Sequence, residues 1–245
     1  MKKLLLMLLL LFPLAGLAEE GPALEEAPDL SNNPAALQRG AKLFVNYCLG
    51  CHSAQSMRYN RLHDIGLTDD EIKSNLLFAT DAVGDTMKVA MRPVDAKVWF
   101  GTAPPDLSVM ARAKSPDYIY TYLRTYYRDP TRPTGWNNLA YPNTAMPHVL
   151  WQLQGMRDAT FNEKVNPENP DEKDMVFAGW KQVTDGTLNQ VQYDSAAADL
   201  TAFMTYMSEP ARKTRHELGV WVLLFLAVFT FITWRLNAVF WKDVH

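Results

Sequence analysis

The chain has 245 residues, of which 48% are hydrophobic, and a formal net charge of −3. This length can bury one sizeable core and suggests one or two domains, and the small net charge gives no indication of nucleic-acid binding. Only two cysteines are present, which is too few for a disulfide framework or for a four-cysteine zinc site.

The first 18 residues have the pattern of a secretory signal. Two lysines precede an apolar run over residues 4–17, and small residues end at Ala18. The run is short for a membrane-spanning helix, although an uncleaved anchor is the alternative interpretation. We therefore expect a signal peptide at residues 1–18, followed by an extended, unpacked acidic segment from Glu19 to Asn33.

A helix is predicted from Ala35 to Tyr47, with capping side chains before it and Pro34 in its first turn. It leads directly into Cys48-Leu49-Gly50-Cys51-His52. This spacing is typical of covalent haem attachment, in which two thiols form thioethers to the haem vinyl groups and the histidine ligates the iron. A zinc site would need a second ligand pair, and a redox dithiol would leave His52 without a role. Export fits this motif, because c-type haem is attached on the outer side of the bacterial inner membrane.

The sequence pattern in the middle of the chain predicts short helices separated by loops. Thr68 and Glu71 indicate a capping box for a helix that runs to about Phe78. A further helix is expected from Ser115 to Tyr126. No sustained alternation of strand type occurs, so the domain is expected to be mainly α. The segment that follows is kept in loops by Pro130, Pro133, Gly135, Pro142 and Pro147.

An acidic stretch, residues 158–199, carries nine carboxylates against three lysines. One interpretation is a solvated insertion loop. The other is a docking surface for a basic electron-transfer partner, because complementary charge speeds encounter more than it tightens binding. The sequence leaves both open.

An apolar stripe at helical spacing predicts a helix over Ser195–Ser208, which Pro210 ends. Its members are Leu200, Phe203, Met204 and Met207. Gly40, one turn before Phe44 in the earlier helix, would permit a close crossing between the two helices. A helix before the haem motif that crosses a helix at the end of the soluble region resembles the class I cytochrome c fold, here with loop insertions.

The segment Leu218–Trp234 is strongly apolar and, extended to Trp241, is long enough to span a bilayer as one C-terminal transmembrane helix. A buried core helix is the alternative. Positive charges are denser on its N-terminal side, so the positive-inside rule alone favours the opposite topology. The signal and the haem motif outweigh that rule. We expect residues 19–216 in the periplasm, an anchor at 217–241 and a cytoplasmic tail at 242–245.

The second axial position of the iron decides between an electron carrier and a catalyst. Candidates are His63, His148 and the methionines of the soluble part, most of which are core filler. Met146 stands out because it lies in the proline-stiffened loop Tyr141–Pro147. His148 is its main rival, with a surface histidine as the simplest explanation for that residue.

One further segment carries a family resemblance. Gly101–Ser108 reads Gly-Thr-Ala-Pro-Pro-Asp-Leu-Ser, which resembles the A-x-P-P-D-L-S signature of the cytochrome c1 family. The resemblance extends from the helix before the haem motif to Ser208-Glu209-Pro210 and the C-terminal anchor. It therefore covers nearly the whole mature chain.

The resemblance implies one covalently attached haem c per chain. Cys48 and Cys51 would carry the thioethers, His52 would be the proximal iron ligand and Met146 the distal one. Pro105 would lie against the haem on the histidine side, where a backbone carbonyl could accept the other ring N–H of His52.

Other residues of the signature region have expected roles by the same resemblance. Candidates for the haem propionates are Arg112, Lys114 and Tyr118, while residues 106–108 are expected to cap a turn. The sequence departs from the family pattern at two places. Lys114 stands where many members have an arginine, and residues 99–101 replace an asparagine-rich stretch.

The function that the resemblance implies is that of an electron-transfer subunit of the quinol–cytochrome c oxidoreductase, the bc1 complex. The chain would take an electron from the Rieske iron–sulfur protein and pass it to a soluble or membrane-bound cytochrome c, with its anchor in the bacterial inner membrane beside cytochrome b. No bond-making catalysis is expected of the chain itself. A free-standing membrane-anchored cytochrome c carrier would share every ligand, and a haem enzyme or gas sensor would need an open iron position.

Overall fold

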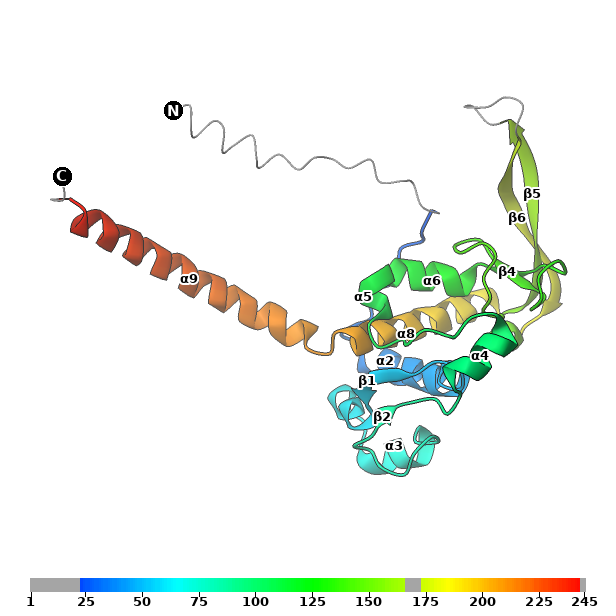
Figure 1. Cartoon of the computed structure of the whole chain (residues 1–245), viewed down its shortest axis with the longest axis horizontal. Coiled ribbons are helices and arrows are strands. Elements are labelled where there is room, and N and C mark those ends of the chain that lie inside the picture. Colours follow the sequence, from blue (N-terminus) through cyan, green and yellow to red (C-terminus); the bar gives the residue numbers. More distant parts are fainter. Residues whose placement is uncertain (1–22, 166–172, 243–245) are drawn as a thin grey trace.

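The computed structural model describes residues 23–165 and 173–242. Within these residues, a mainly helical domain carries a projecting β-hairpin and a long terminal helix that leaves the domain (Figure 1). The expected signal peptide, residues 1–18, lies outside the described residues.

The core of the domain is built on two helices. Helix α2 (Pro34–Leu43) begins where predicted, because the side chain of Asn33 accepts a hydrogen bond from the backbone N–H of Ala36 and Pro34 needs no donor of its own. It continues as the π-helix η1 (Phe44–Cys48), which enters the haem motif directly. Helix α8 (Gln190–Ser208) begins earlier than the predicted Ser195, at a capping box formed by Asn189 and Gln192.

The predicted crossing of α2 and α8 is present. A Cβ atom on Gly40 would lie 2.1 Å from the backbone oxygen of Asp199, so only glycine fits at this point. One turn further, the rings of Phe44 and Phe203 meet with centroids 5.6 Å apart. The apolar stripe of α8 is buried, as expected for the face that packs on α2.

Smaller elements link the two helices, and two of them end earlier than predicted. Helix α3 has the predicted capping box at Thr68 but ends at Asn75 instead of Phe78. Helix α6 ends at Arg124, because the side-chain amide of Asn138 donates to the backbone oxygen of Tyr122 (2.7 Å), and Tyr126 pairs with Asn138 instead of continuing the helix. The bounds of these elements are β1 (Ala54–Arg58), η2 (Tyr59–Ile65), α3 (Asp69–Asn75), β2 (Thr86–Met87), α4 (Pro93–Phe100), α5 (Met110–Lys114), α6 (Pro116–Arg124), β3 (Tyr126–Arg128), β4 (Trp136–Asn138) and α7 (Trp151–Gln154).

The prediction that the middle of the chain lacks strands is wrong. Strands β5 (Gly155–Val165) and β6 (Lys173–Asp185) form a long antiparallel hairpin that projects from the domain (Figure 1), and β3 pairs with β4. The register of the long hairpin shifts twice, between Met156 and Arg157 and between Thr160 and Phe161. Each shift breaks the alternation of side chains, so the sequence does not show a regular period of two.

The acidic segment before α2 is extended, as predicted, but it is not unpacked. The backbone N–H of Glu25 donates to the hydroxyl of Thr121 (2.8 Å), and that of Ala27 donates to the carboxylate of Asp117 (2.8 Å). Glu25 also forms an ion pair with Arg124. The segment lies on α6 because its backbone donors find side-chain acceptors there.

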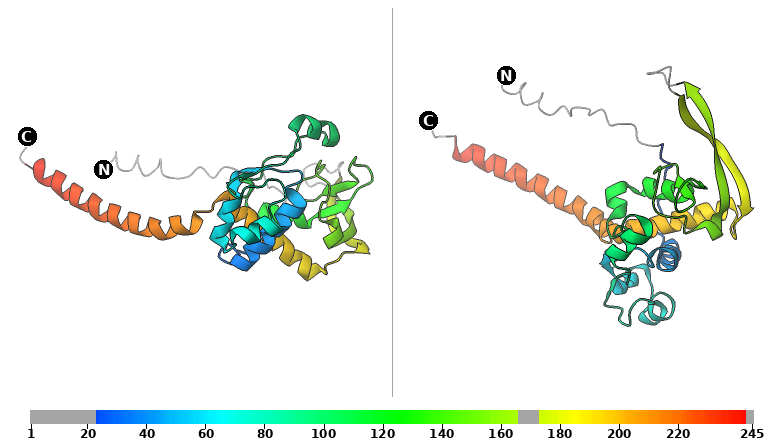
Figure 2. Two further views of the ribbon diagram at one scale, coloured as in Figure 1. Left: turned by 90° about the horizontal axis from the view of Figure 1, so that it is seen from below. Right: turned by 45° about the vertical axis from the view of Figure 1, so that its right-hand side comes forward.

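Helix α9 (Arg212–Phe240) is the predicted C-terminal helix. Within the described residues it is the one helix that is long and apolar enough to cross a membrane, over Thr214–Phe240, and none of that segment is buried against the domain. Both views of Figure 2 show it extending away from the domain. A long apolar helix without a partner in its own chain fits a membrane anchor.

Candidate functional site

The haem motif forms a tight turn at the end of the π-helix. The backbone oxygen of Cys48 accepts hydrogen bonds from the N–H groups of Cys51 (3.0 Å) and His52 (2.8 Å). Cys48 is buried, and burial, aided by the neighbouring Cys51, raises the pKa of its thiol to about 12. The turn therefore holds both thiols and the imidazole within five consecutive residues.

The imidazole of His52 is fixed by the signature segment. Its Nδ1 lies 2.7 Å from the backbone oxygen of Pro105, which is the contact that the family resemblance implies. A carbonyl oxygen only accepts, so Nδ1 carries the hydrogen and the neutral ring keeps its lone pair on Nε2. Burial lowers the pKa of His52, although the bond to Pro105 and the charge of Asp106 oppose it. The ring is thus set as a neutral nitrogen ligand.

The residues after Pro105 do more than cap a turn. Asp106 accepts hydrogen bonds from the backbone N–H groups of Ser108 and Gln55 (2.9 Å each), and the Ser108 hydroxyl accepts from the N–H of Ser56 (3.0 Å). Partial burial raises the pKa of Asp106, but the hydrogen bonds from Ser108 and Gln55 outweigh it and hold the pKa below its usual value. The signature therefore lies along the segment that follows the motif, a pairing that the sequence did not indicate.

Met146 lies half-buried in the loop between β4 and α7. Asn143, in the same loop, adopts the left-handed conformation (φ 63°) that asparagine tolerates. Its N–H donates to the side chain of Asn137 (2.7 Å), and its carbonyl accepts from Arg132 (3.0 Å). From the sequence, only the prolines were expected to stiffen this loop. In the structure, polar side chains of β4 and of the β3–β4 turn also hold it through hydrogen bonds, which the sequence did not indicate.

The two rival histidines are engaged elsewhere. His148 is 2% exposed, its Nε2 lies 2.7 Å from the side-chain oxygen of Gln154, and burial lowers its pKa to about 3. The alternative interpretation of His148 as a surface histidine is therefore wrong. His63 lies on the surface and pairs with Asp69 (2.7 Å). Both histidines are thus already hydrogen-bonded to neighbouring side chains.

The candidate propionate residues lie on neighbouring short helices. Arg112 and Lys114 are exposed on α5, and the ammonium group of Lys114 lies 5.7 Å from the centre of the Tyr118 ring on α6. Tyr118 stacks on Tyr122 with centroids 6.0 Å apart. The structure thus brings Lys114 and Tyr118 together.

The donor set fits a c-type haem. It comprises a buried neutral imidazole with a free Nε2, two thiols in the adjoining turn and a thioether in a braced loop. In residues 23–165 and 173–242, no group of three or more histidine, cysteine, aspartate or glutamate side chains could hold a bare metal ion. Nitrogen and sulfur donors without carboxylates suit haem iron.

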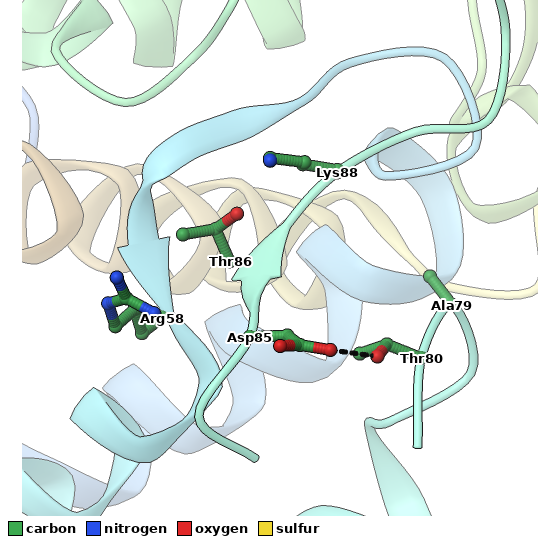
Figure 3. A pocket seen from close by; sticks show the side chains of 6 residues that line it. All are labelled: Arg58, Ala79, Thr80, Asp85, Thr86 and Lys88. Carbon is green, nitrogen blue, oxygen red and sulfur yellow. Dashed lines mark hydrogen bonds between the residues drawn. The ribbon is translucent and has the colours of Figure 1, made fainter. Parts of the chain in front are cut away.

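An open pocket lies at the β1–β2 pair, away from these donors. Its lining includes Arg58, Asp85 and Lys88, and its volume is about 430 Å³. Figure 3 shows these side chains around it. Arg58 donates to the backbone oxygen of Gly84 (2.6 Å), and Asp85 accepts from Thr80. Most of the polar groups that line this pocket are already paired, and no predicted ligand faces it.

Four of the six carboxylates that the acidic stretch has in the described residues form ion pairs within the chain. The interpretation as a solvated loop is wrong, because residues 158–165 and 173–185 are strands and residues from 190 onward are helical. Its paired carboxylates are Asp158 with Arg128, Glu163 with Lys173, Asp194 with Arg124 and Asp199 with Arg39. The interpretation of the stretch as a docking surface for a basic partner stays a prediction.

Known proteins provide a context for this arrangement. The sequence matches the cytochrome c1 family over residues 29–244. Cytochrome c1 of Allochromatium vinosum is 44% identical over 248 residues, which cover the whole of both chains. The ammonia monooxygenase gamma subunit of Nitrosomonas europaea is 43% identical over 246 residues, all of this chain and 99% of that one. Cytochrome b/c1 of Bradyrhizobium diazoefficiens is 25% identical over 251 residues, 86% of this chain and 33% of the relative.

Proposed function

The chain belongs to the cytochrome c1 family, and from this premise we propose that it is the haem-bearing electron-transfer subunit of a quinol–cytochrome c oxidoreductase, the bc1 complex. Family membership implies haem, and the relative named cytochrome b/c1 supports a complex with cytochrome b. The observation that carries the proposal is the bond between Nδ1 of His52 and the carbonyl of Pro105, because it joins the family signature to the proximal ligand.

We assign the haem contacts to individual residues. Cys48 and Cys51 would hold one haem c through thioethers, and the Nε2 of His52 and the sulfur of Met146 would be the ligands of its iron. When bound, the haem supplies one-electron redox chemistry, and histidine–methionine ligation gives it a raised potential. The chain fixes the His52 ring through Pro105 and withdraws it from water by burial. Arg112, Lys114 and Tyr118 remain our candidates for the propionates.

The proposed path of the electron runs from the Rieske iron–sulfur protein, through this subunit, to a soluble or membrane-bound cytochrome c. We place residues 19–216 in the periplasm as a class I cytochrome c-type domain, which the crossing of α2 and α8 beside the motif supports. Residues 1–18 are the signal peptide, 217–241 the anchor in the bacterial inner membrane and 242–245 the tail. The apolar surface of α9 is available for cytochrome b.

Native electrophoresis of detergent-solubilised membranes tests the assignment to a complex. The gel is stained for covalent haem and probed for cytochrome b and the Rieske protein. Co-migration of all three supports the bc1 assignment. If the haem of this chain runs alone, it is a free-standing membrane-anchored carrier, and the subunit proposal is wrong.

Spectroscopy of the ferric protein tests the ligands. The weak red absorption band that reports iron–sulfur ligation is expected in the natural chain and should be lost in Met146→Leu. Cys51→Ser should reduce covalent haem, because one thioether is missing. A His63→Gln variant should keep both signals, because that side chain pairs with Asp69 on the surface. A natural chain without the red band would favour an open iron and a haem enzyme or sensor.

A further inference from the structure

Two tyrosines hold the methionine loop from one side. The hydroxyl hydrogen of Tyr126 is shared between the backbone oxygen of Met146 (3.1 Å) and the hydroxyl of Tyr122 (2.7 Å). The hydroxyl of Tyr122 in turn lies 2.8 Å from that of Thr144. Tyr126 is fully buried, so these bonds form away from solvent. The loop is thereby held at Met146 itself and two residues before it.

His148 holds the loop two residues after Met146. Its ring stacks on Tyr126 with centroids 4.7 Å apart and 5° between the planes. It also lies at 80° to the ring of Trp136, with centroids 5.1 Å apart. Its Nε2 bonds to Gln154, the last residue of α7. An imidazole with one nitrogen paired and its ring stacked has few other conformations available.

Tyr126 and His148 are both hydrogen-bonded to residues at the base of the β5–β6 hairpin. Gln154 directly precedes β5, and Arg157 in β5 donates to the backbone oxygen of Tyr126 (3.0 Å). Arg157 is only 4% exposed, and its guanidinium lies 3.6 Å from the centre of the Trp180 ring in β6. The hairpin that the sequence did not predict therefore reaches the methionine loop through two separate hydrogen-bonded contacts.

We propose that Tyr126 and His148 are positioning residues for the Met146 sulfur, and that the base of the β5–β6 hairpin holds both of them through Arg157 and Gln154. The proposal rests on the assignment of Met146 as the distal ligand. A thioether is a weak ligand, so the fraction of molecules in which it binds iron depends on how often the loop adopts an open conformation. Residues that hold the loop lower the population of open states, just as preorganisation strengthens any other weak contact.

The test uses the full chain, matured with haem and purified in detergent. The variant His148→Phe keeps an aromatic ring against Tyr126 and loses the hydrogen bond to Gln154. Cyanide binding to the ferric iron requires the methionine to leave, so its association rate reports loop opening. A buried hydrogen bond contributes about 1 kcal/mol, which corresponds to an increase of roughly five- to tenfold in that rate. The reduction potential should fall, because methionine ligation raises it.

Two further variants separate positioning from general stability. His63→Phe removes an equally short bond, 2.7 Å to Asp69, on the surface element η2, and should leave the cyanide rate unchanged. His148→Phe combined with Gln154→Met replaces the buried polar pair with an apolar one and should recover stability against denaturant. The proposal expects the cyanide rate of this double variant to stay high, because the loop is still released.

Three results would contradict the proposal. One is a natural cyanide rate and red band in His148→Phe. Another is recovery of both the natural cyanide rate and the natural stability in the His148→Phe, Gln154→Met double variant. His148 would then act only through packing. The third is a natural chain without the red band, because Met146 would then not be the ligand and the ligand assignment under the proposed function would fail with it. Co-migration with cytochrome b is independent of all three.

Discussion

The two sides of the proposed haem site are held in different ways. On the histidine side, Cys48, Cys51 and His52 lie in one turn, and a single segment, residues 105–108, fixes the ring and the chain that follows it. On the methionine side, Met146 lies in a loop whose position depends on side chains from α6, β3, β4, α7 and β5. The residues that hold the ligand are close together in the sequence on the histidine side and come from many parts of the fold on the methionine side.

The two sides should respond differently when a supporting contact is lost. The histidine is next in sequence to a proposed covalent link, so the loss of one supporting contact leaves it beside the iron. The methionine has no such link, and each lost contact raises the fraction of molecules in which the loop is open. Variants on the two sides should therefore separate stability from ligation.

The largest expected effect comes from the crossing of α2 and α8, on which both sides depend. In Gly40→Ala the new methyl group would meet the backbone oxygen of Asp199 at 2.1 Å and the Cβ of Phe203 at 2.7 Å. Backbone cannot move aside as a flexible side chain does, so we expect a loss of about 3 kcal/mol or more in the free energy of unfolding. Denaturant titration followed by circular dichroism measures it.

Gly84→Ala is the matched control for that variant. A Cβ at Gly84 has no heavy atom within 4 Å, so the same chemical change should leave stability within about 0.5 kcal/mol of the natural chain. Equal losses for Gly40→Ala and Gly84→Ala would show that the close crossing does not determine the stability of the domain.

The next largest effect is expected on the methionine side, from Arg157→Met. Methionine fills similar space but leaves the backbone oxygens of Tyr126 and Arg124 without the donors that Arg157 provides. Burial without a donor should cost about 2 kcal/mol of stability, and the red band should weaken at denaturant concentrations that still leave the helices folded. If the red band and the helical signal were lost at the same denaturant concentration, Arg157 would not hold the methionine loop specifically.

Arg128→Met is a control on the neighbouring strand. Arg128 forms its ion pair with Asp158 near the surface, where such pairs contribute little. The red band should persist in this variant as it does in the natural chain. A band as weak as that of Arg157→Met would mean that any change in β3 or β5 disturbs the loop.

The contrast also explains what the sequence could predict. The helix before the motif, the apolar stripe of α8 and the capping box at Thr68 were predicted correctly, because each is carried by a short local pattern. The carbonyl partner of His52 was implied by the family resemblance of residues 101–108. The bonds that hold Met146 join residues that are far apart in the chain and belong to common types, such as asparagine and tyrosine. No local pattern marks them.

The hairpin was not predicted, and the surface alternative for His148 was wrong, for related reasons. Two register shifts conceal the alternation of β5 and β6, and Glu163 of β5 forms an ion pair with Lys173 of β6. His148 follows Pro147 in a polar loop, which is typical of a surface residue, but it is buried by Tyr126 and Trp136 from another part of the chain. Burial imposed by distant residues is not visible in a single sequence.

A smaller effect is expected on the histidine side, from Ser108→Ala. The variant removes the hydroxyl that accepts from the N–H of Ser56 and should cost about 1 kcal/mol of stability. The red band and the cyanide rate should not change, because the distal loop has no contact with this hydroxyl and His52 keeps its bond to Pro105. A faster cyanide rate here would contradict the separation of the two sides.

The smallest effect is a change in acid stability, from Asp106→Asn. The pKa of Asp106 is held below its usual value of 3.8, so its charged form contributes stability that is fully present above pH 3.8 and is lost as the pH falls through the lower folded value. Solvent screens this exposed carboxylate, and the contribution should stay below about 1 kcal/mol. We therefore expect Asp106→Asn to be slightly less stable than the natural chain at neutral pH and to approach it below pH 3.8 in denaturant titrations. A difference of the same size at every pH would mean that the charge of Asp106 is not what steadies the segment after His52. The histidine side would then depend on the shape of the signature alone, through the carbonyl of Pro105 and the hydroxyl of Ser108.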